Sequence, residues 1–312
     1  MRAIEVNHAG QLAVAAAELP SAGPGELLVR VHAISINRGE VLRARAAGQG
    51  FRPGWDFAGE VAGGGTSHLT PGTRVAGFLP SGAWAAVLAV APRQIASIPD
   101  GVSFEQAASL PVAGLTALGA IDAGGNLVGR KVLVTGATGG VGYFAVHLAA
   151  LSGGQVTAVV RRPAEHCRPL FPQGTKVISV QSGLRGVGGN GPFDLIVETL
   201  GGATLGEAMG MLTEAGKCVT LGVTDQADTL FDAERFFMTG SASLQGFVLF
   251  RDRLSTPAEG MERLLRLVAS GKLPIEIGLT DSWENIERVA EKLIARQFVG
   301  KAVVTLEAGQ TL

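Results

Sequence analysis

A glycine-rich turn between an apolar strand and an apolar helix constrains this chain more than any other segment. Residues 131–135 read KVLVT, residues 136–142 read GATGGVG, and an apolar helical run continues to Ala149. Small residues in such a turn let the backbone approach a diphosphate, and the start of the helix offers free N–H groups and the positive end of its dipole. The order of strand, turn and helix predicts a dinucleotide site, although Ala137 replaces the first glycine of G-x-G-x-x-G.

The predicted binding residues lie in the turn and at the start of the helix: Thr138, Gly139, Gly140, Val141 and Gly142. Gly142 is expected to let the helix pack closely on the strand. A tight turn of an α/β protein with no ligand is the alternative interpretation, and the strand–turn–helix order favours the dinucleotide.

The residues after the next strand distinguish between the two nicotinamide cofactors. An NAD site usually has Asp or Glu about 20 residues beyond the glycines, where it accepts from the ribose 2′-hydroxyl. Here the strand at residues 156–160 ends in Arg161 and Arg162, and the nearest acid is Glu165. Two guanidinium groups suit a 2′-phosphate through charge-assisted hydrogen bonds. The sequence therefore predicts NADP(H), with a solvated basic loop as the alternative.

Strand and helix patterns alternate through the second half of the chain, which is typical of a doubly wound parallel sheet. The expected strands are residues 131–135, 155–160, 193–198 and 217–221, and the expected helices are residues 115–123, 141–152 and 205–212. Helical spacing of apolar residues returns at 257–269 and 282–296, followed by a final strand at 301–306.

The first hundred residues instead show short β-type runs separated by Gly and Pro, which favours a barrel or a sandwich. The expected strands are residues 26–33, 57–62, 74–78, 83–90 and 94–98. Ser103 and Gln106 fit a capping box, so we expect a helix to begin there. Residues 42–52 and 231–250 are expected to be loops.

Composition excludes several classes of partner. The 26 basic and 27 acidic residues give a net charge of −1, so neither nucleic acid nor an anionic membrane is expected as a partner. No uncharged run is long enough to span a bilayer, and the N-terminus does not resemble a signal peptide. Two cysteines cannot form a disulfide framework, so we expect a cytoplasmic protein. The length of 312 residues suggests two domains.

Six motifs in order resemble the zinc-free quinone oxidoreductase (zeta-crystallin-like) branch of the medium-chain dehydrogenase/reductase superfamily. They are residues 34–40 (ISINRGE), 53–61 (PGWDFAGEV), 110–117 (LPVAGLTA), 136–142, 193–202 (FDLIVETLGG) and 300–304 (GKAVV). The resemblance covers nearly the whole chain.

The resemblance implies an α/β protein with a Rossmann domain and a GroES-like β-barrel catalytic domain. The catalytic domain would be discontinuous, formed by residues 1–112 and 248–312, with the Rossmann domain at residues 113–247. It also implies a cofactor cleft between the domains and a homodimer or tetramer joined through the Rossmann sheet.

Zinc is not expected. A catalytic zinc site needs about three Cys, His or carboxylate ligands. Zinc-dependent relatives have Cys at the position of Asn37 and Gly-His-Glu at the position of residues 55–57, which read WDF here. The five histidines are scattered, and a structural zinc site would need four cysteines.

The resemblance also implies further site residues. Asn37 would lie near the nicotinamide ribose and the substrate carbonyl, and a turn-capping Asn is the alternative. Thr116 would lie beside the nicotinamide amide or simply begin a helix. Thr199 and the turn of Leu221, Gly222 and Val223 would follow parallel strands, where α/β sheets bind ligands. Phe247 and Lys301 would close over the cofactor.

Three departures from the family pattern remain. Val180 stands where many relatives have a Tyr that contacts the 2′-phosphate. The single tyrosine, Tyr143, is expected to be packed, with a site role as the alternative. Asp56 is a remote candidate acid, and a turn carboxylate is the favoured interpretation.

The predicted reaction is zinc-free hydride transfer from NADPH to a quinone or an α,β-unsaturated carbonyl, with Asn37 as the leading hydrogen-bond donor and water as the proton source. A non-catalytic NADPH-binding regulator and a zinc alcohol dehydrogenase are the alternatives. The sequence does not identify the acceptor.

Overall fold

The computed structural model describes residues 1–64, 69–225, 227–251 and 257–306. The chain divides into two compact units. The first is Met1–Leu115 with Arg253–Leu312, and the second is Thr116–Asp252. The boundary between Leu115 and Thr116 falls inside one helix, α3 (Pro111–Gly124).

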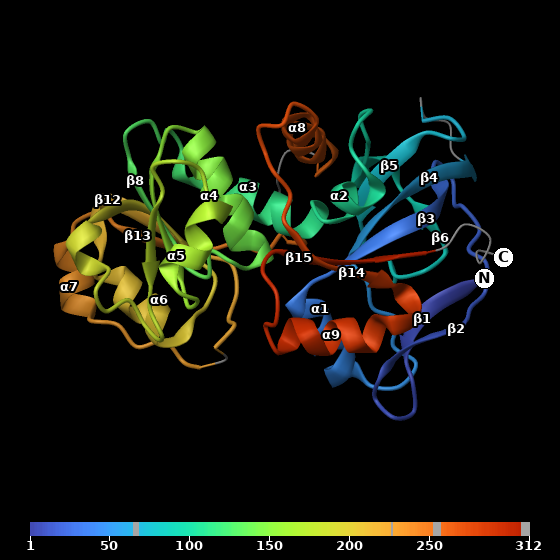
Figure 1. Cartoon of the computed structure of the whole chain (residues 1–312), viewed down its shortest axis with the longest axis horizontal. Coiled ribbons are helices and arrows are strands. Elements are labelled where there is room, and N and C mark those ends of the chain that lie inside the picture. The colour runs from blue at the N-terminus through green and yellow to red at the C-terminus, as the bar shows by residue number, and fades with distance from the viewer. Residues whose placement is uncertain (65–68, 226, 252–256, 307–312) are drawn as a thin grey trace. The chain divides into compact units, whose positions relative to one another are not determined.

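The second unit contains a six-stranded, fully parallel sheet in the order β10-β9-β8-β11-β12-β13. This is the strand order of a doubly wound dinucleotide-binding fold, with its reversal between β8 and β11. The strands are β8 (Lys131–Val134), β9 (Gln155–Val160), β10 (Lys176–Ser179), β11 (Phe193–Glu198), β12 (Leu212–Thr220) and β13 (Ser243–Gly246). Of these strands, β8, β12 and β13 are labelled in Figure 1. The α-helices that accompany them are α4 (Gly140–Leu151), α5 (Ala164–Cys167), α6 (Gly202–Met209) and α7 (Ala233–Met238).

The first unit is built on a seven-stranded sheet whose central strand is the ten-residue β3 (Leu27–Ile36). Its pairings are antiparallel except between β14 and β15. The other strands are β4 (Asp56–Gly64), β5 (Arg74–Phe78), β6 (Val87–Val90), β7 (Ile95–Ser97), β14 (Ile277–Ser282) and β15 (Lys301–Thr305). A separate hairpin joins β1 (Arg2–Val6) and β2 (Leu12–Ala16).

Four α-helices pack within this unit: α1 (Arg38–Ala47), α2 (Phe104–Ala108), α8 (Pro257–Ala269) and α9 (Ile286–Ile294). Its core gathers the buried side chains of Trp84, Trp283 and Phe57 with aliphatic residues from the sheet. The capping box predicted at Ser103 and Gln106 is present at the start of α2.

Several expected boundaries were wrong for local physical reasons. Residues 42–52 are not a loop throughout, because Asn37 and Glu40 start α1 and Gly48, with φ of 79°, ends it. The helix expected at 205–212 ends at Met209, because Leu212 pairs with Phe193 and begins β12. Residues 83–86 are buried but irregular, so β6 begins only at Val87.

The expected loop at 231–250 contains α7 and β13. Asp232 caps α7, and β13 adds to the sheet beside β12. The helix expected at 282–296 begins at Ile286, since Ser282 instead caps a short 3-10 turn. Among the helices of the described residues, none has the length and apolar character of a membrane span.

Candidate functional site

The glycine-rich turn lies where β8 meets α4. Gly136 takes a positive φ of 58°, and Gly139 is the N-cap residue of α4. A Cβ atom at Gly142 would lie 2.3 Å from the Gly136 carbonyl oxygen and 2.9 Å from Ala137 Cα. Only glycine therefore fits at position 142, where the first turn of the helix packs against the turn itself.

The start of α4 is open to a ligand. The first N–H groups of a helix have no intrahelical acceptor, and here no side chain caps the helix either. Thr138, Gly140 and Val141 are half-buried and Gly139 is exposed, whereas Thr135 and Ala137 behind them are buried. Small residues at the start of a helix and the positive end of its dipole fit a diphosphate.

Arg161 and Arg162 directly follow β9, the strand that pairs with β8. Both side chains are exposed. The Arg161 carbonyl oxygen accepts from Ser179 Oγ at 3.5 Å and Gln181 Nε2 at 3.4 Å, which ties this loop to the residues that end and follow β10. The two arginines thus follow β9, which is the neighbour of β8, and β8 leads into the glycine-rich turn.

The ends of β8 and β11 are joined by a buried polar network that sequence reasoning missed. Thr135 Oγ1 donates to Glu198 Oε1 at 3.1 Å and accepts from the Thr199 N–H at 2.9 Å. Thr199 Oγ1 donates to the Thr135 carbonyl oxygen at 3.0 Å. The pairing of β8 with β11 places these residues side by side, which the local sequence pattern does not show.

Glu198 is the centre of this network. Its carboxylate accepts from the Leu200 N–H at 2.8 Å and from the Gly201 N–H at 3.0 Å. Burial raises the pKa of Glu198, and the two backbone donors with the Thr135 hydroxyl act in the opposite direction. Both oxygens of this buried carboxylate accept hydrogen bonds, and the two from backbone N–H groups fix the turn after β11.

The remaining predicted residues of the second unit have different surroundings. The Leu221 N–H donates to the Glu198 carbonyl oxygen at 2.8 Å, which places this turn beside the end of β11. Val223 is 61 % exposed. Phe247 is buried against Gly119 of α3, where a Cβ atom would lie 2.4 Å from its ring. Thr116 is buried on the same helix.

In the first unit, Asn37 and Lys301 come together although they are far apart in the sequence. Lys301 Nζ donates to Asn37 Oδ1 at 2.6 Å. Asn37 Nδ2 donates to Asp56 Oδ2 at 2.7 Å and to Glu40 Oε1 at 3.1 Å. Asn37 is also the N-cap residue of α1, where its backbone N–H donates to the Glu40 carboxyl.

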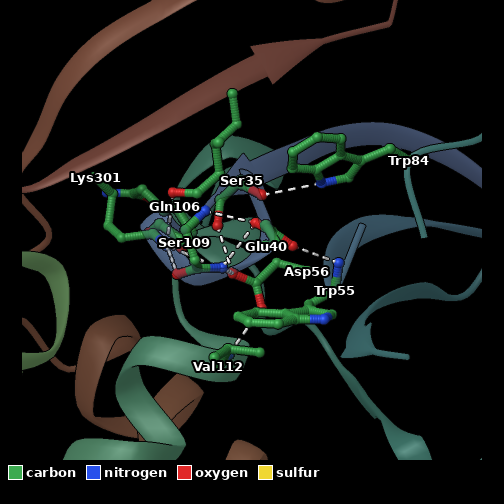
Figure 2. Close-up of polar contacts among 11 residues, drawn as sticks. Ser35, Glu40, Trp55, Asp56, Trp84, Gln106, Ser109, Val112 and Lys301 are labelled. Carbon is green, nitrogen blue, oxygen red and sulfur yellow. Dashed lines mark hydrogen bonds and ion pairs between the residues drawn. The ribbon is translucent and has the colours of Figure 1, made fainter. Parts of the chain in front are cut away.

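Asp56 is not a turn carboxylate, so the favoured interpretation of this residue was wrong. It is the first residue of β4 and is fully buried. It accepts from Ser35 Oγ at 2.6 Å and from the Val112 N–H at 2.8 Å, and Lys301 Nζ lies 3.5 Å away (Figure 2). Asp56 therefore links β3, the start of α3 and β15.

Glu40 is the second buried carboxyl of this cluster and was also missed. Its oxygens accept from the Asn37 N–H at 2.5 Å and from the Trp55 N–H at 2.8 Å (Figure 2). Burial, together with the charge of Asp56, raises the pKa of Glu40 well above its usual value. The spacing Asn37-x-x-Glu40 is a capping pattern, and it was the one signal that could have identified Glu40.

Tyr143 is packed, as predicted. It is buried on α4, and its ring lies 4.5 Å from the His147 ring and 5.8 Å from the Phe144 ring, centroid to centroid. Within the described residues, no group of three or more His, Cys, Asp or Glu side chains is placed to hold a metal ion.

Two family models match the chain. The model described as "Alcohol dehydrogenase GroES-like domain" matches residues 23–100, and "Zinc-binding dehydrogenase" matches residues 140–270. The chain belongs to the medium-chain dehydrogenase/reductase superfamily. The Rossmann and GroES-like domains predicted for such a protein are thereby confirmed.

Solved members of this superfamily share the fold over the whole chain. The quinone oxidoreductase of Coxiella burnetii is 25 % identical with a TM-score of 0.84, covering 98 % of this chain and 99 % of that one. A mycobacterial protein solved with NADPH has a TM-score of 0.86 at 24 % identity, covering 98 % of this chain and 100 % of its own. The similarity to the Coxiella protein supports the zinc-free quinone oxidoreductase branch.

Curated relatives share only part of their length with this superfamily member. The human mitochondrial NAD(P)H oxidoreductase RTN4IP1 is 31 % identical over 214 residues, which is 58 % of this chain and 53 % of that protein. Erythronolide synthase EryA2 of Saccharopolyspora erythraea is 32 % identical over 300 residues, 91 % of this chain but 8 % of the synthase.

Proposed function

We propose that this chain is an NADPH-dependent oxidoreductase that transfers hydride to a quinone or an α,β-unsaturated carbonyl without zinc. The observation that carries the proposal is the start of α4, which follows the glycine-rich turn and is capped by no side chain. β8 leads into this turn, and Arg161 and Arg162 follow β9, the strand that pairs with β8. The names of the human NAD(P)H oxidoreductase and of the Coxiella quinone oxidoreductase support the same chemistry.

The chain's own residues would bind and orient the cofactor. The N–H groups of Gly140, Val141 and Gly142 would bind the diphosphate, and Arg161 and Arg162 would pair with the 2′-phosphate. Thr116, Thr199, Phe247, Lys301 and the turn of Leu221, Gly222 and Val223 remain proposed contacts. The nicotinamide supplies the hydride once bound, and the protein supplies position and excludes water.

Asn37 is the proposed residue nearest the reacting atoms. Both N–H groups of its amide are already donated, to Asp56 and to Glu40. Donation to a developing oxyanion would therefore require one of these hydrogen bonds to be released, and the energetic benefit would be smaller than for a free amide. The proton is proposed to come from water.

A cofactor titration followed by a turnover assay tests this function. NADPH and NADH are titrated by fluorescence, and oxidation of NADPH is then followed with a panel of quinones and enones. We expect tighter binding of NADPH and turnover of at least one acceptor class. Saturable binding without oxidation of any acceptor would instead support a non-catalytic NADPH-binding regulator.

The absence of zinc is tested by metal analysis of the purified protein. Asn37 and Trp55 stand where the zinc-dependent pattern has Cys and Gly, and Asp56 is committed to Ser35, Asn37 and Val112. We expect far less than one zinc per chain and no loss of activity with a chelator. About one tightly held zinc per chain would support an alcohol dehydrogenase.

The proposed assembly is a homodimer joined through the edge of the parallel sheet. β13 is one of the two edge strands of this sheet, and Leu244 on it is 43 % exposed. Phe237 and Met238 at the end of α7 are 67 % and 70 % exposed. Sedimentation should show a dimer for the wild type and a monomer for Leu244→Lys.

The cytoplasmic location remains a prediction from the two cysteines, which are buried and unpaired.

A further inference from the structure

Two helix starts follow neighbouring strands of the parallel sheet, and the turn that enters one of them is hydrogen-bonded to a carboxylate of the chain itself. α4 begins after β8 with no side chain capping it. The turn that enters α6 follows β11, and there the Leu200 and Gly201 N–H groups donate to the Glu198 carboxylate at 2.8 and 3.0 Å. The turn before α6 thus already holds an anion that belongs to the chain.

The same carboxylate braces the glycine-rich turn. Thr135, which leads into that turn, donates its hydroxyl to Glu198 and receives the Thr199 N–H. A Cβ atom at Gly136 would lie 2.5 Å from Thr199 Oγ1, so the two backbone segments are in close contact. Thr135 and Glu198 are both fully buried. Movement of the turn after β11 would therefore displace the phosphate-binding turn.

We propose that Glu198 is a positioning residue for the cofactor site: it occupies the N–H groups before α6 and, through Thr135, holds the glycine-rich turn in its binding shape. This inference rests on the proposed binding of NADPH, but the bracing of the turn exists without any ligand.

The test compares two carboxylates at opposite ends of β11. Asp194, near the start of the strand, accepts from Arg130 at 3.0 Å, from the Lys131 N–H at 2.8 Å and from Thr213 Oγ1 at 3.3 Å. Asp194→Asn is thus a matched control that loses a hydrogen-bonded carboxylate away from the glycine-rich turn. Glu198→Gln and Glu198→Ala are the test variants, with Glu198→Asp as the conservative one.

The first readout is amide hydrogen exchange without cofactor. We expect faster exchange across residues 136–142 and 199–202 in Glu198→Gln and Glu198→Ala, and wild-type exchange there in Asp194→Asn. Unchanged exchange at 136–142 in both Glu198 variants would overturn the inference. This result does not depend on whether the chain binds NADPH.

The second readout is the dissociation constant for NADPH. Because the glycine-rich turn would lose part of its bracing, we expect NADPH binding to weaken by about 5- to 30-fold in Glu198→Gln, which is about 1–2 kcal/mol, with Glu198→Asp between it and the wild type. Asp194→Asn should lower the melting temperature without this loss. Equal NADPH affinity in all variants would show that Glu198 does not position the cofactor site, and would refute the proposal. Failure of the wild type to bind either nucleotide would instead refute the proposed function.

Discussion

Lys301 Nζ and Asn37 Oδ1 lie 2.6 Å apart, and this contact fixes the orientation of the Asn37 amide. In the opposite orientation, the NH2 group of Asn37 would face the Lys301 ammonium and its oxygen would face the carboxyls of Asp56 and Glu40. The hydrogen-bond network therefore assigns the orientation in which Oδ1 faces Lys301. Asn37 is thereby held by one cation and two carboxyls, all of them buried. Its position in the proposed site depends on the balance of these charges.

Removing the single cation of this cluster should strongly destabilise the first unit. The side chains of Lys301 and Asp56 are 3 % and 0 % exposed, and removing one partner of a buried ion pair typically costs about 3–5 kcal/mol. We expect Lys301→Met to lower the free energy of unfolding, measured in urea, by about this amount. Lys272→Met, at an exposed lysine of the same unit, should change it by less than about 0.5 kcal/mol. Equal stability of the two variants would show that the ion pair contributes little.

Cofactor preference should depend on the two arginines after β9. Charge-assisted hydrogen bonds contribute about 1.5–3 kcal/mol each, so Arg161→Ala/Arg162→Ala should weaken NADPH binding roughly tenfold or more. NADH lacks the 2′-phosphate, so its affinity should remain near the wild-type value. Arg168→Ala, at an exposed arginine a few residues later, is the control. A double variant that still prefers NADPH would place the phosphate site elsewhere.

A methyl group at Gly142 should abolish cofactor binding. The added Cβ would lie 2.3 Å from the Gly136 carbonyl oxygen, and backbone cannot move aside as a flexible side chain can. We expect Gly142→Ala to lose measurable NADPH binding in a fluorescence titration. Gly189→Ala, where a Cβ meets nothing within 4 Å, should bind NADPH as the wild type does. Retained binding in Gly142→Ala would mean that the diphosphate does not rest on this turn.

The sequence predicted the parts of this protein that depend on local patterns. The strand, glycine-rich turn and helix at residues 131–151 appear together because their signals are adjacent in the chain. The burial of Asp56 could not be predicted in this way, since Ser35, Val112 and Lys301 surround it from distant segments. Glu198 escaped notice for the same reason, because its partner Thr135 lies 63 residues away on another strand.

Glu40 should make the stability of the first unit depend on pH. Burial and the neighbouring Asp56 raise its pKa in the folded state well above the usual 4.5, with Lys301 acting in the opposite direction. As pH rises above about 4.5, the unfolded chain loses this proton while the folded chain keeps it. The contribution of Glu40 to stability is therefore complete below the unfolded pKa and is lost as pH rises through the folded pKa.

Glu40→Gln isolates this effect, because an amide resembles the protonated carboxyl and does not titrate. Urea unfolding of both proteins from about pH 5 to about pH 8 should show the wild type losing stability relative to Glu40→Gln, by at most about 1.4 kcal/mol per pH unit. Titrating groups that do not interact with Glu40 are shared by the two proteins and cancel in the difference. Parallel stability curves would mean that Glu40 is ionised in the folded chain, and that the cluster around Asn37 carries two negative charges against one positive charge.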